Sequence, residues 1–214
     1  MVANAPSPEQ EAALEALDSA EPGARGIVTE VVWTSERLGH AAALNAGVRR
    51  AAAPVVIILD TSVEPEGDLV SALMGALADP GVAVAGPFGL VSDDLRRFEG
   101  APEGATDVDA IEGYALAFRR ADYVARGPLD EHFAFYRNLD IWWSLVLRDQ
   151  DEDAPDEAPP RRAVRVTGVP VLRHEHRGWT SVSEADRDRL SKKNFYRVLK
   201  RFATRRDLLV RRGS

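Results

Sequence analysis

The chain has 214 residues, of which 45% are hydrophobic and 29% charged, and its net charge is −7. This length suits one domain with a full core, and the composition excludes a fibrous or fully disordered chain. The sequence contains no cysteine, which excludes disulfides, thiolate metal sites and a cysteine nucleophile. It shows no signal-peptide pattern and no apolar run near the ~20 residues that a membrane span needs, so we expect a cytoplasmic protein.

The first fifty residues predict two helices and a strand. Ser7, Pro8 and the acidic residues after them are typical of a helix start. Residues 27–33 alternate and are β-branched, which indicates a strand. Residues 38–50 are rich in alanine, and we expect a helix whose small side chains let it lie close to a sheet or a ligand.

The run of five apolar residues at 55–59 is followed by the carboxylate of Asp60. A continuous apolar run suits a strand that is buried on both faces, as in a mainly parallel sheet. In such sheets ligands bind beyond the carboxyl ends of the strands. Asp60 could there hold a divalent cation against a diphosphate, since hard cations prefer oxygen ligands. The alternative is that Asp60 caps a loop after a core strand.

The remainder of the chain predicts alternating helices and strands with one long surface loop. Helices are expected over 68–77, 139–147 and 184–210, strands over 82–88 and 111–118, a strand pair over 162–172, and a loop over 92–104. Trp142 and Trp143 are expected to anchor their helix in the core, and the alternative is a platform for a sugar ring. The acidic run 149–160 is expected to be a solvated loop.

Several short motifs occur in a characteristic order along the chain. They are LGHAAALNAG at 38–47, the strand ending in Asp60, EGYALAFRR at 112–120, GPLDEHF at 127–133 and YRNLD at 136–140. This order and spacing resembles the family 2 glycosyltransferases, which have the GT-A fold and use nucleotide-sugar donors. The likeness covers roughly residues 2–180. It implies an α/β, Rossmann-like domain over 1–180, with a mainly parallel central sheet flanked by helices, and a basic helical extension over 181–214.

The resemblance also implies a donor-binding site. Its expected residues are Gly39, Asn45, Asp60, Ser62, Glu112 and Gly113. Asn45 would point at the base or ribose, and the alternative is that it bonds the neighbouring backbone. Glu112 would contact the donor sugar, and the alternative is an ordinary edge-facing carboxylate.

The resemblance further implies a metal and a catalytic base. Asp60 with His174 or His176 would hold Mg²⁺ or Mn²⁺ on the diphosphate, and alternation along an extended chain would place both imidazoles on one side. Asp140, or alternatively Asp130, would take the proton of the acceptor hydroxyl in an inverting transfer.

Three departures from the family pattern bear on activity. The opening residues 1–5 match only the end of the family's second strand, and Ala3 stands where an aspartate usually pairs with the base. We therefore expect a shortened N-terminus and an apolar sheet edge, which leads either to a partner chain that covers the edge or to poor solubility. Ser62 replaces the second carboxylate of the Asp-x-Asp motif. Arg137-Asn138 replaces a Glu-Asp pair, and an amide cannot accept a proton at neutral pH.

The sequence thus predicts a metal-assisted, inverting transferase that moves a sugar from a nucleotide-diphosphate donor to a saccharide or lipid-linked acceptor, for example in cell-envelope polysaccharide synthesis. The alternative is a catalytically silent relative with a binding or assembly role.

The C-terminal segment 187–212 holds eleven basic residues against two acidic ones. It is either a solvated helix face, a phosphate-binding surface, or a patch that contacts anionic lipid at the inner face of a membrane. A homo-oligomer is also expected, and a nucleic-acid partner is not.

Overall fold

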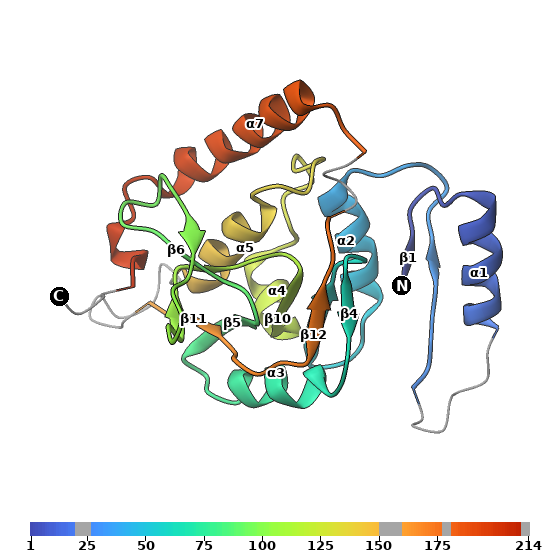
Figure 1. The fold of residues 1–214 in the computed structure, drawn as a ribbon, viewed down its shortest axis with the longest axis horizontal. Coiled ribbons are helices and arrows are strands. Elements are labelled where there is room, and N and C mark those ends of the chain that lie inside the picture. The colour runs from blue at the N-terminus through green and yellow to red at the C-terminus, as the bar shows by residue number, and fades with distance from the viewer. Residues whose placement is uncertain (20–26, 150–159, 177–180, 211–214) are drawn as a thin grey trace. The chain divides into compact units, whose positions relative to one another are not determined.

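The computed structural model describes residues 1–19, 27–149, 160–176 and 181–210 (Figure 1). The chain forms two compact units. Unit 1 comprises residues 1–52 and 129–135, and unit 2 comprises residues 53–128 and 136–214. The predicted division at residue 180 is drawn on sequence likeness and stays a prediction. The acidic residues 150–159 lie outside the described part of the chain.

Unit 1 contains a two-stranded parallel sheet and two helices: β1 (Val2–Ala3), α1 (Pro8–Asp18), β2 (Val32–Trp33) and α2 (His40–Arg50). The predicted helix start at Ser7 is confirmed. The Ser7 hydroxyl accepts a hydrogen bond from the Gln10 backbone, and the Gln10 side chain accepts one from the Ser7 backbone. The strand expected over 27–33 is confined to two residues because it pairs with β1, which is itself two residues long.

Unit 2 is built around a five-stranded sheet with smaller sheets beside it. Its elements are β3 (Val55–Leu59), β4 (Val63–Pro65), α3 (Leu69–Leu77), β5 (Val82–Gly86), β6 (Gly89–Val91), β7 (Glu99–Gly100), β8 (Asp107–Val108), β9 (Ala110–Ile111), β10 (Ala115–Arg119), α4 (Arg120–Arg126), α5 (Leu139–Arg148), β11 (Arg162–Arg165), β12 (Val171–Arg173), α7 (Glu184–Phe202) and a 3-10 turn, η1 (Arg206–Leu208).

The five-stranded sheet has the order β3-β10-β5-β11-β8. β10 runs antiparallel to both β3 and β5, whereas β11 runs parallel to β5. The expected α/β architecture is therefore confirmed, and the sheet is mixed rather than mainly parallel. The reason is that a continuous apolar strand indicates burial on both faces and carries no information about the direction of its neighbour.

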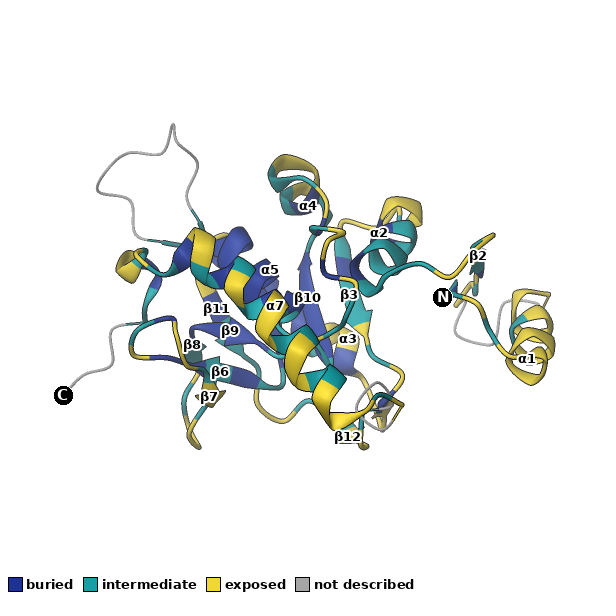
Figure 2. Ribbon diagram, turned by 90° about the horizontal axis from the view of Figure 1, so that it is seen from above, coloured by how far each residue is buried: buried dark blue, intermediate teal, exposed yellow. Residues whose placement is uncertain are grey.

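Helices cover both faces of this sheet (Figure 2). Successive side chains of a strand point to opposite faces. On β10, Ala117 packs into the cluster formed by Leu69, Leu73 and Leu77 of α3. Its neighbour Phe118 instead contacts the rings of Tyr123 on α4 and Trp143 on α5, so α3 lies on one face and α4 and α5 on the other. Trp143 is buried, as predicted, and so is Trp142.

Two predicted strands differ in detail. The strand expected over 111–118 is interrupted at residues 112–114, which leave the sheet as a turn between β9 and β10. The strand pair expected over 162–172 turns at Gly168, whose φ is 73°, but its halves do not pair with each other. β11 joins the main sheet, while β12 pairs with β4.

A buried arginine ties the C-terminal segment of unit 2 to its core. The Arg148 guanidinium donates hydrogen bonds to the backbone carbonyls of Asp109, Arg161 and Leu208. The Asp109 carboxylate accepts hydrogen bonds from the backbone amides of Ser92 and Val210, each at 2.7 Å. These bonds fix η1 and the end of the described chain on α5.

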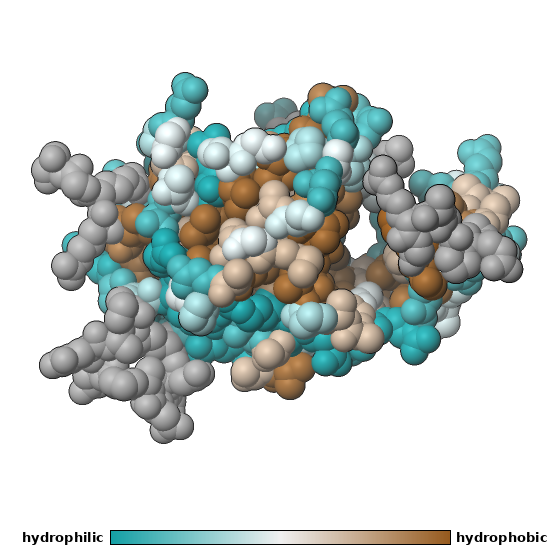
Figure 3. All heavy atoms as spheres, turned by 90° about the horizontal axis from the view of Figure 1, so that it is seen from below, coloured by the Kyte–Doolittle hydropathy of each residue, from teal (hydrophilic) through white to brown (hydrophobic). Residues whose placement is uncertain are grey.

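α3 is apolar around much of its circumference. Leu73 is fully buried, whereas Val70 and Met74 are about half exposed, at 49% and 47%. Figure 3 shows apolar surface on the side of unit 2 where α3 lies. None of the helices that the structure describes has the length and apolar composition needed to cross a bilayer.

Candidate active site

Asp60 occupies the turn between β3 and β4, at the carboxyl end of β3 as predicted. Its backbone amide donates to the Tyr114 carbonyl at 2.9 Å, which extends the β3–β10 ladder by one residue. Its carboxylate accepts a hydrogen bond from the Ser62 amide at 2.8 Å, the geometry of a tight Asx turn. The side chain is thus fixed at the rim of the sheet.

His176 is the partner of this carboxylate. Its Nε2 lies 3.2 Å from Asp60 Oδ2, and both side chains are about 15% exposed. The imidazole stacks on the Tyr136 ring at 3.8 Å and meets the edge of Tyr114 at 5.7 Å. Burial raises the pKa of Asp60, but the bonds from His176 and Ser62 outweigh burial and lower the pKa to about 2. Asp60 is therefore fully ionised at neutral pH.

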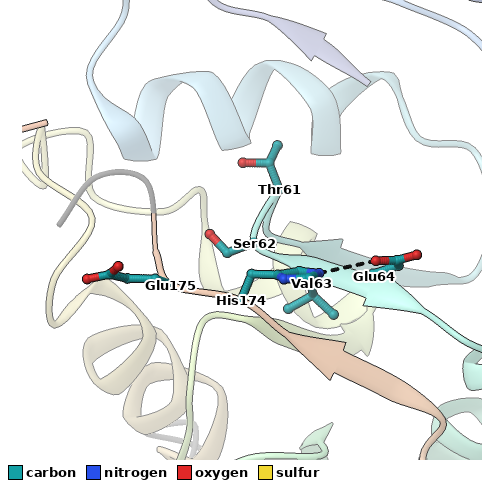
Figure 4. A pocket seen from close by; sticks show the side chains of 6 residues that line it. All are labelled: Thr61, Ser62, Val63, Glu64, His174 and Glu175. Carbon is teal, nitrogen blue, oxygen red and sulfur yellow. Dashed lines mark hydrogen bonds and ion pairs between the residues drawn. The ribbon is translucent and has the colours of Figure 1, made fainter. Parts of the chain in front are cut away.

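His174 has a different partner. Its Nε2 lies 3.1 Å from Glu64 Oε2, and both side chains are at least half exposed. Figure 4 shows this pair lining a pocket of about 350 Å³ together with Thr61, Ser62, Val63 and Glu175. β12 ends at Arg173, and the His174 amide bonds the Ser62 carbonyl at 2.7 Å, so the expected alternation does not bring the two histidines to one carboxylate.

Of the two predicted histidine ligands, His176 thus lies beside Asp60, whereas His174 pairs with Glu64. Within the described ranges no three His, Cys, Asp or Glu side chains gather in a way that could hold a metal ion. Asp60 and His176 do fit a shared cation. Two ligands at right angles, each about 2.1 Å from Mg²⁺, lie about 3 Å apart, close to the observed 3.2 Å. The Ser62 hydroxyl beside them is buried and has no hydrogen-bond partner among the described residues.

Glu112 forms an ion pair that sequence reasoning did not identify. Its carboxylate lies 3.1 Å from Arg173 Nη1, and the guanidinium stacks over the Tyr114 ring, 3.8 Å from its centre. Burial raises the pKa of Glu112, and the charge of Arg173 only partly opposes this effect. Because Tyr114 contacts both His176 and Arg173, it joins the Asp60 pair and the Glu112 pair into one site.

Asp140, on the first turn of α5, holds the Glu112-Gly113 turn. Its Oδ2 accepts a hydrogen bond from the Gly113 amide at 2.9 Å, and its Oδ1 accepts one from the Ile141 amide at 2.9 Å. A Cβ on Gly113 would lie 3.2 Å from the Asp140 Cβ, which explains why glycine suits this position. Burial raises the pKa of Asp140 above the ordinary range of an aspartate.

Arg137 and Asn138 are held by α7. Asn138 adopts a left-handed conformation, with φ of 67°, and its amide donates to the Ser191 carbonyl at 3.0 Å. The Asn194 side chain donates to the Arg137 carbonyl at 2.8 Å. The amide that replaces a family carboxylate therefore serves as a tether for the segment that leads to Asp140.

The remaining candidates belong to unit 1. Asn45 is fully buried, and its amide group donates to the Leu129 carbonyl and the Glu131 carboxylate, each at 2.9 Å. Its oxygen accepts a hydrogen bond from the Leu129 amide at 3.0 Å. Asn45 thus bonds a backbone segment far along the chain, and a nucleotide contact from its side chain stays a prediction.

Gly39 and Asp130 lie in unit 1 as well. A Cβ on Gly39 would come within 2.9 Å of the Ala134 backbone, so glycine here permits the close approach of residues 133–134. Asp130 Oδ1 accepts a hydrogen bond from the His132 amide at 3.0 Å and lies 2.7 Å from His132 Nδ1.

Unit 2 thus brings together six of the predicted residues: Asp60, Ser62, Glu112, Gly113, Asp140 and His176. The residues that sequence reasoning missed are Arg173, Tyr114 and Tyr136. Tyr114 and Tyr136 lie within quoted motifs, and Arg173 directly precedes the predicted histidines. The available signal was therefore their place in or beside these motifs.

The sequence matches the family model described as "Glycosyl transferase family 2" over residues 9–140. No curated protein is found to match the sequence. Two solved structures have similar folds. One is a crystal structure of GalNAc-T7 with UDP, GalNAc and Mn²⁺, with a TM-score of 0.64 at 17% identity over 93% of this chain and 40% of that chain.

The other is the mannosyltransferase PcManGT from Pyrobaculum calidifontis in complex with GDP-Man and Mn²⁺. Its TM-score is 0.58 at 18% identity over 97% of this chain and 61% of that chain. The chain therefore spans less than two thirds of either protein. At this identity the likeness shows the fold, which is that of GT-A glycosyltransferases. The family match covers more than half of the sequence, and the chain belongs to glycosyl transferase family 2.

Proposed function

We propose that this protein transfers a sugar from a nucleotide-diphosphate donor to an acceptor hydroxyl, with inversion at the anomeric carbon and with the help of a divalent cation. The observation that carries the proposal is the arrangement around Tyr114. It places an ionised carboxylate with an imidazole on one side and a carboxylate–guanidinium pair on the other. Both solved structures with similar folds contain Mn²⁺, one together with UDP and GalNAc and the other with GDP-Man.

Asp60 and His176 would hold Mg²⁺ or Mn²⁺, with the Ser62 hydroxyl as a neutral third donor. When bound, the cation neutralises charge on the diphosphate leaving group. The low pKa of Asp60 keeps its carboxylate charged, so no proton has to leave the carboxylate before the cation binds. His174 and Glu64, at the neighbouring pocket, would contact more distant parts of the donor or its hydration shell.

Glu112 and Gly113 would line the sugar pocket, and Arg173 would fix the direction of the Glu112 carboxylate. The acceptor hydroxyl would give its proton to Asp140, whose raised pKa makes it a stronger base than an exposed aspartate. Asp130 is the second candidate, because it is the other carboxylate close to this segment in the sequence. Gly39 and Asn45 would support the nucleotide through the segment 129–134 that they hold.

Calorimetric titration with UDP and GDP, with and without Mn²⁺, tests the donor site. We expect one of the two nucleotides to bind only when Mn²⁺ is present, and Asp60→Ala to abolish that binding. Asp188→Ala removes an exposed carboxylate of α7 and serves as the matched control, with binding expected to be unchanged. Failure of both nucleotides to bind at millimolar concentration would contradict the proposal and leave a silent family relative as the better description.

The pH dependence of turnover separates the two candidate bases. If Asp140 takes the proton, Asp140→Asn removes the acidic limb of the kcat profile, and that limb lies above the ordinary pKa of an aspartate because burial raises the pKa. Asp130→Asn should then leave the limb in place. The opposite pattern would assign the proton transfer to Asp130.

This proposal includes four further points. They are a saccharide or lipid-linked acceptor, a role in cell-envelope polysaccharide synthesis, a cytoplasmic location and a homo-oligomeric state. They follow from the sequence resemblance, and each is separable from the donor chemistry.

A further inference from the structure

All the lysines of this protein lie on one stripe of α7. The chain has 27 basic residues, and the lysines among them are Lys192, Lys193 and Lys200, whereas every other basic residue is arginine. Tyr196 sits between them. Residues three and four positions apart share one face of a helix, so the spacing 192, 193, 196 and 200 forms a single line. We call these four residues the lysine stripe.

The lysine stripe faces away from the body of unit 2. The opposite side of α7 is buried through Asn194, Val198 and Phe202, and α7 packs on α5. All four residues of the stripe are exposed, and Tyr196 is 70% exposed. Figure 2 shows this exposed side of α7 toward the viewer. Along the helix axis the stripe is about 12 Å long.

Intramolecular ion pairs do not neutralise the stripe. Among the described residues, none of the three ammonium groups has a salt-bridge partner, whereas Arg189, Arg201 and Arg205 each have one. Arg189, one turn before the stripe, pairs with Asp186 at 2.8 Å, and Arg201 and Arg205 on the other side pair with Asp149. The lysines therefore carry uncompensated charge around one exposed aromatic ring.

We infer that the lysine stripe docks this protein on an anionic lipid surface. An ammonium group is a compact point charge on a flexible stem, which suits a diffuse layer of lipid phosphates rather than one bidentate partner. Lysine stems lie along the apolar boundary while their charges reach the headgroups. A tyrosine with an apolar ring and a polar hydroxyl suits the same boundary.

The alternative polyanion, nucleic acid, fits less well. Proteins that bind nucleic acid favour arginine, because its planar guanidinium makes two parallel hydrogen bonds to a phosphate or to a base edge. This chain places no unpaired arginine within the stripe. The net charge of −7 also repels a long polyanion that extends past the stripe, whereas a surface that contacts the stripe alone meets its lysines and Tyr196. The inference does not depend on the proposed sugar transfer.

Sedimentation with lipid vesicles tests the inference on the full chain. We expect binding to vesicles that contain phosphatidylglycerol in phosphatidylcholine, little binding to phosphatidylcholine alone, and weakening by salt. Each lysine near such a surface strengthens binding by roughly fivefold. The triple variant K192Q/K193Q/K200Q should therefore bind about 100-fold more weakly, while R37Q/R96Q/R97Q, which removes the same charge from exposed sites elsewhere, should bind nearly as well as the wild type.

The exclusive location of the lysines permits a second test without mutation. Amine acetylation removes the lysine charges, whereas reductive methylation keeps them, and both reagents act only on the stripe and on the N-terminus. The acetylated protein should lose vesicle binding and the methylated protein should keep it, with circular dichroism showing that both stay folded. Equal binding of the two forms, equal binding to neutral vesicles, or retention by duplex DNA in place of vesicles would each overturn the inference.

Discussion

Replacement of Asp60 by asparagine changes the charge of the candidate active site with little change in shape. The asparagine oxygen can still accept the hydrogen bond from the Ser62 amide, but the variant lacks the negative charge that faces His176. The folded protein lowers the pKa of Asp60 from 3.8 to about 2. One pKa unit corresponds to about 1.4 kcal/mol, so the ionised carboxylate contributes about 2 kcal/mol to the free energy of unfolding at pH 7.

The sign of the pH dependence follows from the direction of this shift. Since the folded pKa lies below the unfolded one, the contribution is complete above about pH 5 and falls as the pH drops toward 2. We expect urea unfolding of the metal-free protein to give a difference of about 2 kcal/mol between wild type and Asp60→Asn at pH 7, and roughly half of that at pH 3.

Asp188→Asn removes an exposed carboxylate of the same kind and should change the free energy of unfolding by less than about 0.5 kcal/mol at either pH. A difference between wild type and Asp60→Asn that stays constant from pH 7 to pH 3 would refute the assignment of the stabilisation to the ionised carboxylate.

Two further changes test the packing that supports the site. Gly86→Ala would press a Cβ into the Ile111 side chain and the Ala115 carbonyl, and we expect urea unfolding to show a free energy of unfolding lower by about 3 kcal/mol. The control Gly75→Ala on α3, where a Cβ meets nothing within 4 Å, should instead raise the free energy of unfolding by about 0.5–1 kcal/mol. A similar effect at both positions would contradict this view. Arg148→Met would leave three buried carbonyls without donors and lower the unfolding free energy by about 3 kcal/mol; an unchanged thermal midpoint would show that solvent replaces those bonds.

Features that depend on local sequence were predictable. The helix start at Ser7 follows from a capping pattern within four residues. The position of Asp60 follows from an apolar run that ends in a carboxylate, since both properties belong to the same strand. The burial of Trp143 follows from its size and its place on an apolar helix.

Features that depend on pairing between distant segments were not predictable. The sequence of β10 does not show that this strand lies antiparallel between β3 and β5, because a buried strand is apolar whichever way it runs. The pair between Glu112 and Arg173 joins positions far apart in sequence. The two histidines separate because β12 ends before them, and the rule of alternating sides holds only within a strand.

The composition of unit 1 bears on how this protein can be dissected. Residues 129–135 belong to the same compact unit as residues 1–52, and the Asn45 side chain joins the two segments through hydrogen bonds to the Leu129 backbone. A recombinant fragment that stops at Ala52 would leave that buried amide without its partners, at a cost of about 1–3 kcal/mol for each unsatisfied group. Unit 1 is therefore encoded by two separate stretches of the gene. Exchange of this unit between homologues requires replacement of both stretches.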